Sequence, residues 1–190
     1  FDEKLYQKLI NLRNLIYSID NLNNYSNDLK ELERDLTIFH SQIVNEIIDE
    51  YKCEIDLIGF HGQTIFHDPK IRISKQLGDG NLLSQLTKKK VVYDFRQEDM
   101  ANGGQGAPLT PIFHNLLSKI LNNNGKIQEK ICFLNIGGIS NITISTNDME
   151  FTNENFKAFD VGPGNCLIDQ WIRQHSKKNY DNNGSIGRSG

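Results

Sequence analysis

Apolar residues between Asp28 and Glu50 recur three or four positions apart, the spacing that places them on one stripe of a helix. This pattern predicts a packing helix over 28–50. A less regular form of the same pattern predicts a helix over 5–19. The asparagine-rich stretch 21–27 is then expected to form the loop that joins the two helices.

Two short apolar runs, 55–60 and 91–95, lead directly into polar residues. Such runs are typical of buried strands that deliver a polar loop at their carboxyl end. The first loop begins at His61, and the second passes through the glycines of 102–108. Open α/β sheets bind ligands at these strand ends. A helix is expected over 109–121, with Pro111 in the first turn, where proline is tolerated.

The second half of the chain begins with two strand-like runs, 131–136 and 139–145, which flank two glycines and predict a β-hairpin. A further strand over 156–159 leads through a glycine turn into a helix that carries Trp171. A strand, a glycine turn and a helix start favour anion binding, because free backbone N–H groups and the helix dipole meet there.

The composition is that of a folded soluble protein, with 37% hydrophobic and 24% charged residues and a net charge of −3, which argues against nucleic acid as a partner. No apolar run approaches the roughly 20 residues that span a bilayer, so no membrane association is expected. The three scattered cysteines, Cys53, Cys132 and Cys166, form no disulfide framework. We therefore expect a cytoplasmic protein.

Three glycine segments stand beside a carboxylate or an amide at the expected strand ends: 103–106, 135–138 and 162–165. Phosphoryl transfer requires close backbone approach to phosphates and a carboxylate, and little covalent chemistry from the protein. Neither a Walker A sequence nor a dinucleotide fingerprint is present. A metal hydrolase that uses His61, His67 and Asp68 remains an alternative.

Five segments carry further information through their order along the chain. They are DLIGFHGQT (56–64) with His67-Asp68-Pro69 behind it, LGDG (77–80), DFR (94–96) with Asp99 and then GGQGAPL (103–109), LNIGGISN (134–141), and FDVGPGN (159–165). In this order they resemble the anhydro-N-acetylmuramic acid kinase family. The likeness runs from about residue 55 to 190 and extends faintly over the preceding helices.

The resemblance implies an α/β fold of the actin, Hsp70 and hexokinase type, which is ribonuclease H-like and has two similar lobes with a cleft between them. The loop 122–125 would be the boundary, so that 1–125 is the remainder of the substrate-side lobe and 126–190 begins the lobe with the phosphate hairpin. The family uses ATP and Mg²⁺ to cleave 1,6-anhydro-N-acetylmuramic acid with water. The sugar is phosphorylated at O6 during bacterial peptidoglycan recycling, which gives N-acetylmuramic acid 6-phosphate.

The resemblance also implies roles for individual residues. Asp160 matches the general base that activates the attacking water, and the alternative is that it caps the following turn. Arg96 is attractive as a carboxylate or phosphate ligand, and the alternative is an ion pair with Asp94 or Asp99. The substrate-side residues are His61, Gly62, Gln63, Thr64, Arg96 and Asp99, the ATP-side residues are Asn135, Gly137, Gly138, Gly162, Gly164 and Asn165, and no metal ligand is assigned.

Two family segments do not occur in the sequence: the first phosphate hairpin, which contains Gly-Thr-Ser-x-Asp-Gly, and the distal glycine-rich adenosine segment. Loss of one preorganised donor costs about 10²–10³ in rate, so we expect the chain, truncated at both ends, to be inactive alone. The alternatives are a non-catalytic amino-sugar-binding remnant, half of a split kinase that pairs with a separately encoded half, and another phosphotransferase or phosphatase of this superfamily. Uncovered sheet edges also predict a homodimer.

Overall fold

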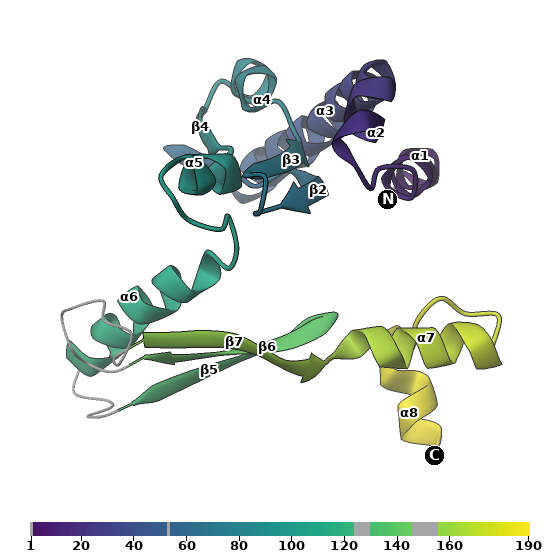
Figure 1. The fold of residues 1–190 in the computed structure, drawn as a ribbon, viewed down its shortest axis with the longest axis vertical. Helices are drawn as coiled ribbons and strands as arrows, with labels where there is room; N and C mark the ends of the chain where they lie inside the picture. The colour runs from purple at the N-terminus through teal and green to yellow at the C-terminus, as the bar shows by residue number, and fades with distance from the viewer. Residues whose placement is uncertain (1, 53, 124–129, 146–155) are drawn as a thin grey trace. The chain divides into compact units, whose positions relative to one another are not determined.

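The computed structural model describes residues 2–52, 54–123, 130–145 and 156–190. Its elements form two compact units, unit 1 over Phe1–Ala107 and unit 2 over Pro108–Gly190, and both mix helices with small sheets (Figure 1). The expected boundary at 125 differs from this division, because helix α6 (Thr110–Asn123) packs against a strand of unit 2. The assignment of lobes to 1–125 and 126–190 remains a prediction.

The first helices of unit 1 are α1 (Glu3–Arg13), α2 (Ile19–Asn24) and α3 (Ser26–Tyr51). The long helix α3 confirms the prediction for 28–50. The predicted loop over 21–27 is wrong, because Ser18 accepts a hydrogen bond from the backbone N–H of Asn21 and so caps α2. The predicted helix over 5–19 is too long, because α1 ends at Arg13 with Asn14 as its C-cap.

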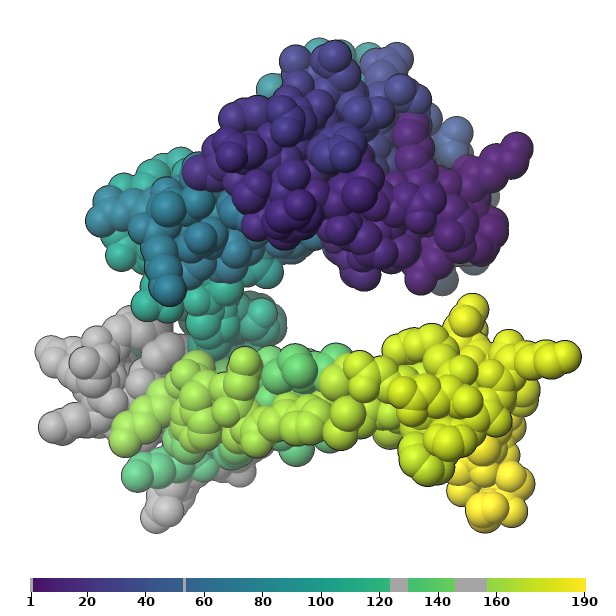
Figure 2. Space-filling model, turned by 45° about the vertical axis from the view of Figure 1, so that its right-hand side comes forward, coloured from purple at the N-terminus to yellow at the C-terminus, as the bar shows by residue number. Residues whose placement is uncertain are grey.

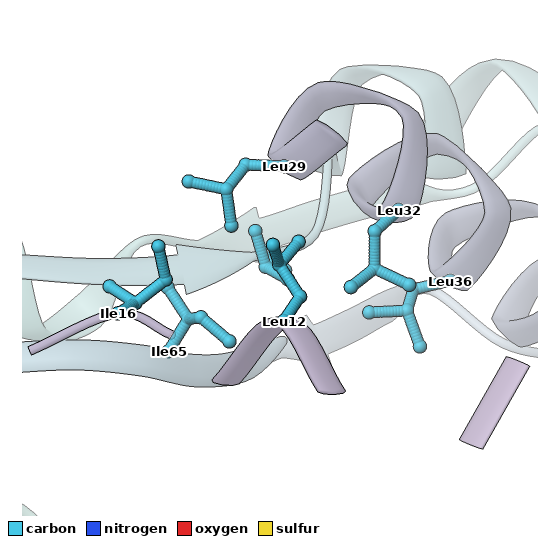
Figure 3. Close-up of a cluster of buried hydrophobic side chains, with 7 residues drawn as sticks. Leu12, Ile16, Leu29, Leu32, Leu36 and Ile65 are labelled. Atoms are coloured by element: carbon cyan, nitrogen blue, oxygen red, sulfur yellow. The ribbon is translucent and has the colours of Figure 1, made fainter. Parts of the chain in front are cut away.

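A hydrophobic core joins these helices to the strands of unit 1. Leu32 has no exposed surface, and Leu77 is 1% exposed. Figure 3 shows the side chains of Leu29, Leu32, Leu36 and Ile65 gathered around Leu12. The cluster consists of Leu12, Ile16, Leu29, Leu32, Leu36, Ile65 and Leu77. Unit 1 therefore has a core of its own.

The strands of unit 1 form two small sheets. The parallel pair β1 (Leu57–Phe60) and β4 (Lys90–Tyr93) confirms both predicted strands. The antiparallel pair β2 (Gln63–Asp68) and β3 (Ile73–Leu77) was missed, because the residues after His61 were interpreted as a loop. Two short helices complete the unit: α4 (Gly80–Thr87) and α5 (Phe95–Ala101).

Unit 2 is built on an antiparallel sheet of three strands. These are β5 (Ile131–Ile136), β6 (Ile139–Ser145) and β7 (Phe156–Pro163), in that order across the sheet, and the predicted hairpin is confirmed. Helix α6 confirms the prediction for 109–121. Helix α7 (Asn165–His175) continues from β7 (Figure 1), and a short 3-10 helix η1 (Asn182–Gly184) with helix α8 (Ser185–Ser189) ends the chain. Figure 2 shows this last part of the chain in yellow.

Three further findings concern membrane spans, exposed apolar side chains and cysteines. No helix within the described residues is long and apolar enough to cross a membrane. Several large apolar side chains of unit 2 are more than half exposed, among them Leu134, Phe159 and Trp171. Of the cysteines, Cys132 and Cys166 are free, and Cys53 lies outside the described residues.

Candidate functional site

The loop after β1 places His61 and Gly62 at the carboxyl end of a parallel strand pair. Gly62 has a φ of +68°, and a Cβ added there would lie 2.5 Å from the carbonyl oxygen of Leu77. A side chain at this position would therefore clash with the neighbouring strand β3. The expected loop is correct for His61 and Gly62, whereas Gln63 and Thr64 begin strand β2.

Arg96 joins two loops of unit 1. Its Nε donates to Nε2 of His61 at 2.9 Å, and its Nη1 donates to the carbonyl oxygen of Gly106 at 2.7 Å. Since Nε2 of His61 accepts, the proton of the neutral ring is on Nδ1, which lies 2.8 Å from the carbonyl oxygen of Gly62. Within the described residues Arg96 forms no ion pair with Asp94 or Asp99. The alternative of a structural ion pair is therefore wrong.

Asp99 organises the glycine-rich segment that follows α5. Its Oδ2 accepts a hydrogen bond of 2.8 Å from the backbone N–H of Gly106, and its carbonyl oxygen accepts one of 2.9 Å from Gly104. One carboxylate oxygen of this expected substrate residue is thus already engaged. Its other oxygen forms no bond within the described residues.

Thr64 and His67 both bond to the neighbouring strand β3. Thr64 Oγ1 accepts a hydrogen bond of 3.0 Å from Gln76, and His67 Nδ1 lies 3.0 Å from Ser74 Oγ. In the part of the chain that the structure describes, no three histidine, cysteine or acidic side chains gather closely enough to hold a metal ion. The metal-hydrolase alternative, which needs His61, His67 and Asp68 together, therefore has no support in the geometry.

A cavity of about 380 Å³ within unit 1 lies beside the His61 loop. Lys75, Gln76 and Asp94 line it, and Gln76 Oε1 is buried without a hydrogen-bond partner among the described residues. Partial desolvation by its surroundings raises the pKa of Asp94, although the residue is exposed; Lys75 opposes this shift and Glu98 adds to it. The cavity size suits a small ligand. The sequence analysis missed Lys75 and Gln76, because neither stands beside a glycine segment.

The strands of unit 2 bring two predicted site residues and one further polar residue into one row. Asn135 of β5 is in register with Asn141 of β6, which is in register with Asp160 of β7. Residues directly opposite each other on paired strands point to the same face, with Cβ atoms about 4.5–5.5 Å apart. Asp160 is exposed, and the register shifts beside it so that Val161 forms a β-bulge. Bulges often re-aim a side chain beside an active site.

The glycine turn before α7 is packed against the hairpin turn. The backbone N–H groups of Gly164 and Asn165 donate to the carbonyl oxygens of Gly138 and Gly137, each at 2.8 Å. A Cβ at Gly164 would lie 2.3 Å from the carbonyl oxygen of Gly137, so a glycine is required for this approach. The expectation that these amides are free for an anion is therefore wrong.

The two hairpin glycines and Gly162 are placed near that turn. Gly138 is exposed, Gly137 is half-buried, and Gly162 pairs with Ser140 across the sheet. The N-cap of α7 is Gly164, and no side chain of the described residues caps this helix. The capping alternative for Asp160 consequently has no support, and its role as a general base remains a prediction.

Comparison with known proteins gives the family. The model of the anhydro-N-acetylmuramic acid kinase family matches residues 5–190. A protein of Pelagibacter ubique with that name is 53% identical over 190 residues, covering 100% of this chain and 49% of the relative. The protein of the same name from Rhizobium etli is 39% identical over 196 residues, and that from Brucella canis is 44% identical over 165 residues.

The matches cover a larger share of this chain than of its relatives. The Rhizobium match covers 100% of this chain and 50% of the relative, and the Brucella match covers 85% and 42%. The chain thus spans about half the length of the curated relatives that it matches. Because the family model matches residues 5–190 and a relative of that name is 53% identical, the chain belongs to the anhydro-N-acetylmuramic acid kinase family.

Proposed function

We propose that this chain is part of an ATP-dependent sugar kinase of the bacterial cytoplasm, acting in peptidoglycan recycling. It would convert 1,6-anhydro-N-acetylmuramic acid and water to N-acetylmuramic acid 6-phosphate. The observation that carries the proposal is the family match over nearly the whole chain. The two-lobed actin-like fold is part of the same proposal.

Asp160 is the residue that we assign to proton transfer. It is an exposed carboxylate beside a β-bulge, and its side chain has no hydrogen-bond partner within the described residues. A carboxylate in this state can accept a proton from water as the water oxygen attacks C1 of the sugar. The C1–O6 bond then breaks, and O6 accepts the terminal phosphoryl group of ATP, which leaves ADP.

Asn135 of β5 offers an amide oxygen, which is an oxygen ligand of the kind that magnesium or its bound water accepts. Magnesium bound with ATP would neutralise charge on the transferred phosphoryl group. Asn135 and the exposed Gly138 are the residues that we assign to this end of the nucleotide. Gly162, Gly164 and Asn165 support them, because they hold the hairpin turn in place.

The cavity of unit 1 is our candidate for contact with the sugar. Lys75 can donate to a hydroxyl or carboxylate oxygen, the unpartnered Gln76 Oε1 can accept from a hydroxyl group, and His61 lines the same cavity. Phe60 and Tyr93 provide apolar surface for a sugar ring. Arg96 holds the His61 loop in position.

We propose that the isolated chain turns over slowly or not at all, since it spans about half the length of its relatives. This half coverage also favours a second function, binding of the amino sugar without catalysis, alone or paired with a separately encoded half.

Calorimetric titration with the anhydro sugar and with Mg·ATP tests both functions, together with an assay of ADP release. The isolated chain is expected to bind the sugar without turnover. The substitution Gln76→Leu should weaken this binding about tenfold, because a sugar hydroxyl that donates to Gln76 Oε1 then loses its acceptor. Binding of ordinary hexoses in preference to the anhydro sugar would contradict the proposed substrate. Rapid ADP release by this chain would contradict its proposed inactivity.

A further inference from the structure

One face of strand β6 carries three polar side chains in alternation: Asn141, Thr143 and Ser145. Helix α6 provides partners for two of them. Thr143 Oγ1 lies 2.9 Å from His114 Nδ1, and Ser145 Oγ accepts from Asn115 at 3.1 Å. The side chain of Asn141 has no hydrogen-bond partner within the described residues, although it is half-buried.

Asn141 is half-buried, and its side-chain oxygen and nitrogen are not among the buried polar atoms, so they remain accessible to a small ligand. The neighbour of Asn141 across the sheet is Asp160, which also lacks a side-chain partner among the described residues. No hydrogen bond joins the two side chains directly in this part of the chain. Side chains that point to the same face at this separation leave room for one small polar molecule between them.

We propose that Asn141 and Asp160 together hold the water molecule that attacks the sugar. This inference rests on the proposed function and adds Asn141 to the reacting groups. The water donates one hydrogen to the Asp160 carboxylate and the other to Oδ1 of Asn141, so that its free lone pair points away from both.

The proposed step accounts for each bond that forms or breaks and for the proton that is released. The water oxygen forms a bond to C1 as the C1–O6 bond breaks, and one water proton passes to the Asp160 carboxylate. The released O6 takes the phosphoryl group from ATP. Asn141 keeps its protons throughout and acts by orienting the water, which lowers the entropic part of the barrier.

An NMR titration of the labelled 190-residue chain tests this placement without any need for turnover. From about pH 3 to about pH 8, the side-chain N–H₂ signals of Asn141 should shift with the same midpoint as the carboxyl carbon of Asp160. In the variant Asp160→Asn this titration of Asn141 should vanish. Asn141 signals that stay constant while Asp160 titrates would overturn the proposal.

A charge substitution sharpens the test. Asn141→Asp should raise the midpoint of Asp160 by about one unit, because two neighbouring carboxylates repel each other. Cys132→Asp is the matched control, since exposed Cys132 points to the opposite face of the same sheet, and it should shift the midpoint by less than about 0.3 unit. Equal shifts in the two variants would overturn the proposal.

A crystal structure of the chain tests the water itself. A water oxygen is expected within about 3.2 Å of both Asn141 and Asp160. A direct bond between the two side chains would overturn the water-holding role. None of these results depends on kinase activity. Binding of ordinary hexoses in preference to the anhydro sugar would count against the proposed function, whereas coupled Asn141 and Asp160 signals would leave this placement intact.

Discussion

The two units differ in how they bury apolar surface. Ten of the eleven buried hydrophobic residues described in the chain belong to unit 1, and Ile172 alone belongs to unit 2. In unit 2 exposed apolar residues lie on α6, as with Phe113 at 60%, on the sheet, as with Leu134 at 59%, and on α7, as with Trp171 at 63%. Hydrophobic burial is the dominant favourable term in folding. Unit 1 should therefore be stable by itself, and unit 2 should gain stability from contact with a further surface.

The polar residues show a parallel difference. The side chains of Arg96 and Asp99 in unit 1 are engaged with neighbouring loops, whereas Asn141 and Asp160 in unit 2 have no side-chain partner among the described residues. Bonded groups give a rigid scaffold, and unbonded groups are available to a ligand. The comparison thus separates residues that hold the loops of unit 1 in place from residues of unit 2 that are available to react.

The largest expected effect tests the core of unit 1. Leu32→Ala should lower the free energy of unfolding by about 2–5 kcal/mol, because it leaves a cavity at a fully buried position. The matched substitution in unit 2, Leu134→Ala, should change it by less than about 0.5 kcal/mol, because this side chain is exposed. Urea denaturation followed by circular dichroism measures both. Equal effects would contradict the difference between the units.

The next effect concerns the exposed face of α7. If this face mediates self-association, Trp171→Ser should weaken the dimer about 10- to 100-fold, since burial of a large apolar side chain contributes about 1.5–3 kcal/mol. Sedimentation velocity over a concentration series measures this. Tyr17→Ser is the control, because Tyr17 is 79% exposed in unit 1. A compact monomer at all concentrations would show that the apolar face of unit 2 does not drive dimerisation.

The sequence predicted the fold best where periodicity and length agreed. Helix α3 and the β5–β6 hairpin follow directly from apolar spacing and from the glycine pair. Strand β2 was missed because Gln63 and Thr64 are polar, and their pairing with Leu77 and Gln76 is a long-range contact that no local pattern records. Helix α2 was missed because asparagines usually mark loops, whereas a serine cap here favours the helix.

The candidate site was predictable in part. The glycine segments and Asp160 stand out by residue type and order, and they carry the resemblance to the family. The bonding of each group was not predictable. The use of the Gly164 and Asn165 amides by the hairpin carbonyls, and the row that includes Asn141, depend on strand register, which composition and spacing leave open.

A smaller effect compares two aspartates directly. Asp99→Ala should speed exchange of the Gly106 amide hydrogen about tenfold, because this N–H loses a charged acceptor worth about 1.5 kcal/mol or more. Asp160→Ala should leave the exchange of neighbouring amides unchanged, since its carboxylate accepts no hydrogen bond within the described residues. Hydrogen exchange followed by NMR measures both. Fast exchange of Gly106 in the unmodified chain would contradict the rigid scaffold assigned to unit 1.

The smallest expected effect is a pH-dependent change in stability, which has opposite signs for an aspartate of unit 1 and an aspartate of unit 2. In unit 1 partial desolvation raises the folded-state pKa of Asp94, so the ionised form costs stability above that pKa, and the cost disappears as pH falls through it. Asp94→Asn should then stabilise the chain by less than about 1 kcal/mol near neutral pH and have no effect in acid.

In unit 2 the backbone N–H groups of Ile186 and Gly187 lower the pKa of Asp181. The contribution of Asp181 to stability is therefore present at neutral pH and is lost as pH falls through the folded-state pKa. Asp181→Asn should therefore lower the melting temperature at neutral pH, where Asp94→Asn raises it. Thermal unfolding of both variants at neutral and acid pH measures these signs, and a shared sign would mean that Asp94 is not desolvated by the packing of unit 1.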